Sequence, residues 1–88
     1  MSRTDTSKKF TVKNMGASQT FNFNGADFEQ VVIYNTSTPD VFLRDSNNND
    51  FVIKEGVSFN LSTIPSKAIS GLTVVTQSGG TASVAYLA

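Results

Sequence analysis

Residues 29–35 read Glu29-Gln30-Val31-Val32-Ile33-Tyr34-Asn35 and form the most apolar strand-like stretch of the chain. Their β-branched and aromatic side chains favour a strand. Turn-forming residues bound the stretch on both sides, with Asn24-Gly25 before it and residues 36–40 after it. A strand that is apolar on both faces is typical of the middle of a covered sheet. We therefore expect residues 29–35 to form a central strand.

Alternating apolar and polar residues recur on both sides of this strand, which indicates further strands. We expect them at residues 8–14, 19–24, 41–44, 51–54, 57–61, 72–77 and 81–87. The last two are expected to pair as a closing hairpin. Residues 62–70 are expected to form a connection with a single helical turn at residues 66–68.

Short strands separated by turns at this spacing are typical of a sandwich or a small barrel. The sequence therefore predicts an all-β fold, a small single-domain antiparallel β-sandwich of about eight strands with a jelly-roll-like arrangement. We expect the sandwich to span residues 8–88 and a flexible N-terminal arm to span residues 1–7.

The composition lacks two residue types on which many enzymes and metal sites depend. The 88 residues include no histidine and no cysteine. This excludes the commonest general base, the commonest metal ligand and any disulfide. We expect no enzymatic activity, no catalytic residue, no cofactor, no metal and no small-molecule substrate.

The charge pattern also limits the partners. Seven basic residues balance seven acidic ones, and no basic stripe is present, so we expect no binding to nucleic acid. The longest apolar run, residues 31–34, is too short to span a bilayer, and the N-terminus lacks the apolar segment of a signal peptide. We expect a protein made in a cytoplasm, without a membrane partner.

Two polar turns resemble ligand loops in composition only. Residues 45–50 place oxygen-bearing side chains at alternate positions, but an EF-hand loop starting at Asp45 needs glycine where this chain has Asp50 and glutamate where it has Gly56. Residues 78–81 are glycine-rich, but they lack the lysine and the following helix of a P-loop. Both are interpreted as turns.

The strands differ in how polar their outer faces are. Strict alternation predicts that Phe10, Val12, Phe21, Phe23, Val57, Phe59 and Leu61 point inward from strands with polar outer faces. In the other strands it leaves seven apolar residues outward, namely Val32, Tyr34, Phe42, Val52, Val75, Ala85 and Leu87. Strands that are apolar on both faces need cover from another layer.

Another subunit would provide this cover, because a sandwich of this size has no further layer of its own. We expect a homo-oligomer. The predicted interface consists of Val32, Tyr34, Phe42, Val52, Val75 and Leu87. The alternative is that residues 62–70 or the N-terminal arm cover these side chains within the chain.

Residues 29–88 carry a set of strand motifs in a fixed order. They are Val32-Ile33-Tyr34-Asn35-Thr36-Ser37, then Val41-Phe42-Leu43, then Gly56-Val57-Ser58-Phe59-Asn60-Leu61, and finally Ser78-Gly79-Gly80-Thr81-Ala82-Ser83-Val84. This order resembles small all-β virion proteins of tailed phages. The resemblance implies a β-sandwich that assembles on a phage particle, as a capsid cement or decoration protein or as a neck or tail component. It transfers no functional residue, because the shared positions are core and turn positions.

We therefore expect a non-enzymatic virion structural protein that binds other virion subunits. By analogy with the three-fold axes of phage lattices and fibres, a trimer is the preferred form of the homo-oligomer. The alternative is a carbohydrate- or receptor-binding module of a phage fibre. Sugar sites of that class stack a ring on an exposed aromatic side chain. The chain has no tryptophan, and its two tyrosines fall in expected strands, which favours the structural role.

Overall fold

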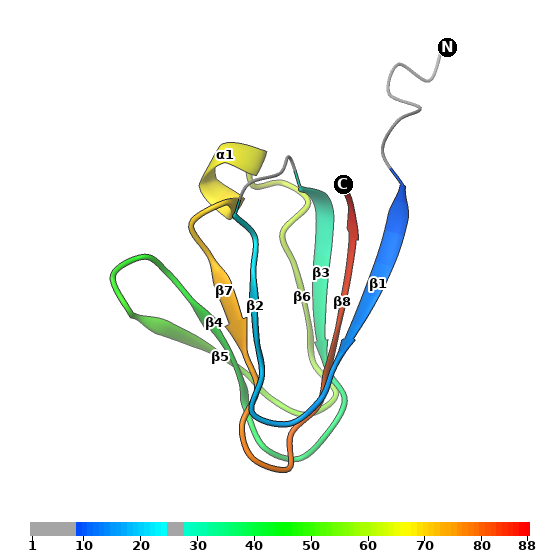
Figure 1. The fold of residues 1–88 in the computed structure, drawn as a ribbon, viewed down its shortest axis with the longest axis vertical. Coiled ribbons are helices and arrows are strands. Elements are labelled where there is room, and N and C mark those ends of the chain that lie inside the picture. Colours follow the sequence, from blue (N-terminus) through cyan, green and yellow to red (C-terminus); the bar gives the residue numbers. More distant parts are fainter. Residues whose placement is uncertain (1–8, 25–27) are drawn as a thin grey trace.

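The computed structural model describes residues 9–24 and 28–88. Within these ranges the chain forms eight strands and one short helix (Figure 1). The strands are β1 (Phe10–Met15), β2 (Thr20–Asn22), β3 (Glu29–Asn35), β4 (Val41–Arg44), β5 (Asp50–Ile53), β6 (Ser58–Asn60), β7 (Thr73–Val75) and β8 (Ala82–Leu87), and the helix α1 spans Ser66–Ile69. The bounds of β3 and β4 agree with those expected. The expected N-terminal arm lies outside the described residues.

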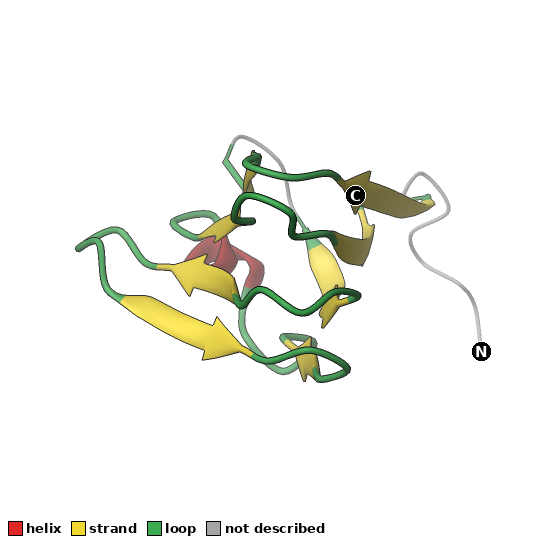
Figure 2. Ribbon diagram, turned by 90° about the horizontal axis from the view of Figure 1, so that it is seen from below, coloured by secondary structure: helices red, strands yellow, loops and turns green. Residues whose placement is uncertain are grey.

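The strands form two antiparallel sheets of four, which Figure 2 shows as separate layers. Sheet A has the order β1-β8-β3-β6, and sheet B has the order β2-β7-β4-β5. Every connection crosses from one sheet to the other except the β4–β5 hairpin, which stays in sheet B. This path is that of a jelly roll. The predicted antiparallel β-sandwich is confirmed.

Strand β3 lies between β8 and β6, as expected for the most apolar strand. A β-bulge interrupts its pairing with β8, because Glu29 lies opposite Leu87 while Val32 lies opposite Ala85. Gln30, within the bulge, has a positive φ of 55°. The extra residue changes the side of the sheet to which the following side chains point, so that Val31 is buried and Val32 faces outward.

The core lies between the two inner sheet faces. Sheet A contributes Met15, Val31, Ile33, Ala82 and Val84, sheet B contributes Val41, Leu43, Ile53 and Val74, and the connections contribute Phe23, Phe28, Leu61 and Ile69. At the α1 end, Phe21, Phe23, Phe28 and Tyr86 form a cluster of mostly edge-to-face rings. The inward positions expected for Phe21 and Phe23 agree with this packing.

The expected closing hairpin is wrong. Strand β7 pairs with β2 and β4, and β8 pairs with β1 and β3, so residues 76–81 carry the chain across the sandwich. The turn itself is tight, because Gly79 has a positive φ and the N–H of Gly80 donates to the carbonyl of Gln77 at 2.8 Å. By crossing, each strand gains two neighbours, whereas a hairpin at the sheet edge would leave one side of it unpaired.

The expected inward positions of Phe10, Val12 and Val57 are also wrong. All three side chains are exposed. Phe10 and Val12 share the outer face of sheet A with Leu87 and Ala85, their partners in β8. On the opposite side of β1, Thr11 and Lys13 are also exposed and Met15 is buried, because this end strand reaches beyond the cover of sheet B. Alternation alone therefore does not identify its inner face.

Candidate functional site

The outer face of sheet A carries a continuous apolar surface, which follows from the strand register. Residues directly opposite in antiparallel strands point to the same side of the sheet. One row crosses β1, β8 and β3 as Val12, Ala85 and Val32. The row on one side of it places Phe10 beside Leu87, and the row on the other side places Tyr34 beside Ser83. We call Phe10, Val12, Val32, Tyr34, Ala85 and Leu87 the apolar face.

The apolar face is unusually exposed for large hydrophobic side chains. Phe10 is 69% exposed, Val12 is 50% exposed and Tyr34 is 42% exposed. Glu29 is the charged residue in the rows that contain these side chains. An extended apolar surface with little charge is characteristic of a site that binds another protein.

The outer face of sheet B differs in its charge. Its apolar row consists of Phe42, Val52 and Val75, which the register places side by side. An ion pair flanks this row at each side. Arg44 binds Asp50 through two hydrogen bonds of 2.7 and 3.1 Å, and the ammonium group of Lys54 lies 3.3 Å from a carboxylate oxygen of Asp40. Charges of this kind favour contact with water over burial at the centre of an interface.

The predicted interface residues are therefore divided between two opposite faces of the sandwich. Val32, Tyr34 and Leu87 lie on the apolar face of sheet A, together with Ala85. Phe42, Val52 and Val75 lie on the outer face of sheet B. Each side chain is half-buried or exposed, in agreement with the outward direction that alternation predicts. One contact surface cannot include both groups.

The sequence pattern did not indicate that Phe10 and Val12 belong to this surface. Their charged neighbours Lys9 and Lys13 suggested a solvated face on the other side of the strand. The pairing with β8 reverses this interpretation, because Leu87 and Ala85 were already expected to point outward. Knowing that residue 10 pairs with residue 87 would have been sufficient to place Phe10 correctly.

Residues 62–70 do not cover the outward side chains. This segment closes one end of the sandwich, where α1 lies (Figure 1). Its residue Ile69 is buried in the core, and Ile64 remains partly exposed at 39%. Tyr34 and Val52 keep more than a third of their surface exposed. The other expected source of cover, the arm at residues 1–7, lies outside the described residues.

The loop from Asp45 to Asp50 is organised by its own hydrogen bonds. One carboxylate oxygen of Asp45 accepts from the backbone N–H groups of Asn47 and Asn49, both at 2.9 Å. These bonds lower the pKa of Asp45, chiefly through Asn49, and the hydrogen bond from Arg44 lowers the pKa of Asp50. Within the described ranges, no group of three or more acidic side chains is placed to hold a metal ion.

An apolar cleft of about 310 Å³ opens between the free edges of the two sheets. Its lining is Leu43, Phe51, Phe59 and Leu72, with Asp45, Asn49 and Asp50 at the polar side. The register of Phe51 with Leu43 places it on the inner side of sheet B. It is nevertheless 53% exposed, because β5 is the last strand of its sheet.

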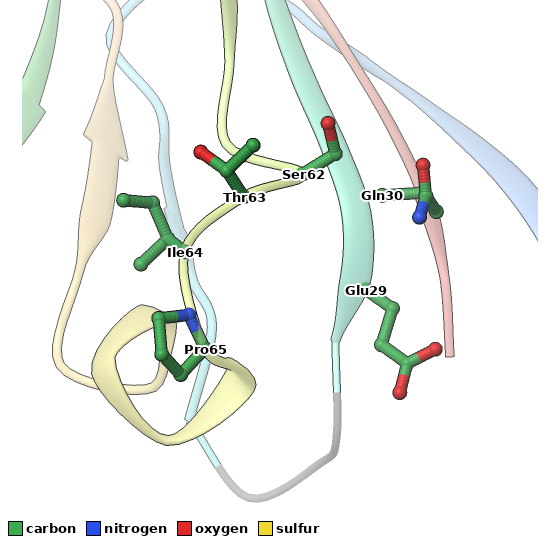
Figure 3. A pocket seen from close by; sticks show the side chains of 6 residues that line it. All are labelled: Glu29, Gln30, Ser62, Thr63, Ile64 and Pro65. Carbon is green, nitrogen blue, oxygen red and sulfur yellow. The ribbon is translucent and has the colours of Figure 1, made fainter.

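A second, more polar cleft of about 280 Å³ lies beside the bulge of β3. Figure 3 shows its lining, with Glu29 and Gln30 on β3 and residues 62–65 on the segment that leads to α1. Its carboxylate, amide and hydroxyl groups can exchange hydrogen bonds with a polar ligand. No aromatic residue lines it, so it offers no surface on which a sugar ring would stack.

The described part of the chain contains no helix that is long and apolar enough to cross a membrane. Comparison of the chain with protein-family models, with curated proteins and with solved structures finds no match.

Proposed function

We propose that this chain is a non-enzymatic structural subunit of a phage virion, a capsid cement or decoration protein or a head–tail component. It binds copies of itself and other virion subunits, and its place is the virion. The exposed apolar face of sheet A is the observation that carries the proposal. A side chain such as Phe10 gains most from burial against another subunit.

The size of the apolar face is consistent with a role in assembly. Its three most exposed side chains and their half-buried neighbours present on the order of 400 Å² of apolar surface. A standard interface buries about 800 Å² per partner. The apolar face would therefore supply about half of such an interface, and the surrounding polar side chains, such as Asn14 and Ser83, would supply its rim.

Two further observations support this proposal. Residues 29–88 resemble small virion proteins of tailed phages in their order of strand motifs. The jelly-roll path is used by viral capsid domains, although it is also used by lectins, so the fold supports the assignment by analogy only.

The test is incorporation into particles. Phages that carry this gene would be purified on a density gradient, and the chain would be sought in the particle fraction by mass spectrometry. We expect the wild-type chain in the particles. A folded Tyr34→Ser, Leu87→Ser double variant, supplied in place of the wild type, is expected to stay in the soluble fraction. Absence of the wild-type chain from purified particles would refute the proposal.

A second candidate function is carbohydrate binding, because the cleft between the sheet edges contains an exposed aromatic ring. Phe51 provides a stacking surface, and Asn49 lies beside it as a hydrogen-bonding group. The test is a titration of isotope-labelled protein with mono- and oligosaccharides, followed by NMR. Shifts confined to the cleft, and their loss in Phe51→Ala, would support this function. Unchanged spectra at tens of millimolar saccharide would exclude it.

A further inference from the structure

The edge of β1 is the longest strand edge without a neighbour in the described ranges. β1 has six residues, whereas the other end strands, β2, β5 and β6, have three or four. β8 pairs with one side of β1, and no described strand lies on the other side. Edges of this length are normally protected by a proline, a bulge, charged side chains or a covering segment. Lys13 is the one charged residue of β1. β1 contains no proline, and its register with β8 is continuous.

The hydrogen bonds to β8 establish which residues of β1 face the free side. The N–H of Lys9 donates to the carbonyl of Ala88 at 3.1 Å, and the N–H of Ala88 donates to the carbonyl of Lys9 at 3.2 Å. Such reciprocal pairs occur at every second residue of an antiparallel ladder. The main-chain groups of Phe10, Val12 and Asn14 therefore point away from β8.

We propose that β1 pairs with β1 of a second copy in an antiparallel contact with two-fold symmetry, centred on Val12. This inference rests on the proposed function, which requires the chain to bind copies of itself. It identifies β1 as the place where two copies meet. In this register Val12 pairs with Val12 of the second copy, and Phe10 pairs with Asn14 at both ends. The three pairs would form about six hydrogen bonds. The two four-stranded sheets become one continuous sheet.

The charges of β1 favour this register over its neighbours. Centring on Val12 places Thr11 opposite Lys13, so no like charges meet. Centring on Lys13 would place the two Lys13 ammonium groups opposite each other. Centring on Thr11 would place Lys9 opposite Lys13. Like charges directly opposite destabilise a strand pair, and both of these registers also form fewer hydrogen bonds.

The contact would also join the apolar faces of the two copies. The row of Val12, Ala85 and Val32 would continue across the two-fold axis into the same row of the second copy. Phe10 would lie diagonally beside Val12 of that copy, within reach of its side chain. The dimer would therefore present one enlarged apolar surface to other virion subunits.

Proline substitution tests the main-chain contact selectively. Val12→Pro removes an N–H that points to the free edge, so the ladder with β8 loses no bond. We expect the variant to keep its β-sheet circular dichroism and to raise the dimer dissociation constant at least about tenfold. Val12→Ala, which keeps the N–H, should remain dimeric. Thr11→Pro should instead lower the melting temperature, because the N–H of Thr11 bonds to β8.

The decisive measurement is amide hydrogen exchange at two protein concentrations, combined with sedimentation equilibrium. We expect a dimer in which the amides of Phe10, Val12 and Asn14 exchange at least about tenfold more slowly than in the dilute monomer. A monomer at millimolar concentration would overturn the inference. An unfolded Val12→Pro chain would also overturn it, because the assigned direction of the Val12 N–H would be wrong.

Two further outcomes would separate this inference from the proposed function. An oligomer whose amides at residues 10, 12 and 14 still exchange rapidly would overturn the edge contact, and the apolar face would remain the site of assembly. Slow exchange of these amides in a monomer would show that the edge is covered within the chain. In both cases, incorporation of the wild-type chain into particles would still support the virion role.

Discussion

The ring of Phe51 in sheet B packs on the ring of Phe59 in sheet A, with ring centroids 4.7 Å apart. The two rings come from β5 and β6, the end strands of the two sheets. They bridge the side of the sandwich at which the apolar cleft opens. Phe59 also lies directly opposite the fully buried Ile33 of β3, so it links this open side to the core.

Substituting Phe59→Ala should destabilise the fold by about 2–3 kcal/mol. This is less than the roughly 3–5 kcal/mol of a fully buried phenylalanine, because Phe59 keeps part of its surface exposed. Urea denaturation followed by circular dichroism would measure the change. Phe10→Ala is the matched control, with an effect of under about 0.5 kcal/mol on the monomer. Equal effects of the two substitutions would contradict this account of the open side.

Asn35 should be the most sensitive polar position among the described residues. Its buried side chain donates to the carbonyls of Pro39 at 3.0 Å and Ile53 at 2.8 Å, and it accepts from the N–H of Ser37 at 3.0 Å. Asn35→Ala leaves these groups without partners and should cost about 2–4 kcal/mol.

The control for this prediction is Asn60→Ala. The exposed side chain of Asn60 accepts hydrogen bonds from the N–H and the hydroxyl of Ser62, and water can replace it there. We expect a loss of under about 1 kcal/mol. If urea denaturation gave Asn35→Ala the same small loss, the three buried bonds would not contribute to stability as proposed.

The sequence predicted the secondary structure well because most strands have one continuous apolar side. It failed where pairing between distant strands decides the outcome. Phe10 has the same alternating pattern as Phe21, yet Phe21 faces the aromatic cluster and Phe10 faces solvent. Their difference arises from position in the sheet, since β2 lies over the core and most of β1 extends past it.

The buried role of Asn35 was also beyond the sequence pattern. An asparagine at the end of a strand is ordinarily interpreted as a turn residue. Here its side chain ties the turn at Pro39 to the end of β5 at Ile53, two segments that are brought together only by the fold. The candidate site was predicted in part. Alternation identified Val32, Tyr34 and Leu87 as outward, but it gave no indication that Val52 lies on the opposite face.

Acid should weaken the β4–β5 hairpin. The pKa values of Asp45 and Asp50 are lowered in the folded chain by the N–H of Asn49 and by Arg44, respectively. A lowered folded-state pKa stabilises the fold at pH values above the unfolded pKa of about 4, and this contribution is lost as the pH falls through the folded value. The melting temperature should therefore decrease when the pH is lowered below about 4.

Asp45→Asn separates this effect from general acid denaturation. The amide oxygen of asparagine can still accept the two loop N–H groups, but the side chain no longer titrates. The variant should show a shallower loss of melting temperature between about pH 4 and pH 2 than the wild type. Parallel profiles for the two proteins would show that Asp45 does not contribute to the pH dependence.

Substitutions on the two outer faces should have different effects on incorporation of the chain into particles. Tyr34→Ser places a small polar side chain on the apolar face of sheet A, where we propose that subunits meet. It should lower incorporation of the chain into particles at least about tenfold, through the loss of aromatic surface from the contact with other virion subunits. Val52→Ser makes a similar polar replacement on sheet B, where ion pairs of Arg44 with Asp50 and of Lys54 with Asp40 flank the apolar row. It should leave incorporation unchanged.

Both side chains are about equally exposed, at 42% for Tyr34 and 41% for Val52, so the comparison is not biased by a difference in burial. Quantitative mass spectrometry of purified particles would measure incorporation, and circular dichroism would confirm that each variant is folded. Loss of incorporation for Val52→Ser but not for Tyr34→Ser would move the interface to sheet B. In that case the ion pairs would lie at the rim of the contact, where charged groups add little affinity but fix orientation.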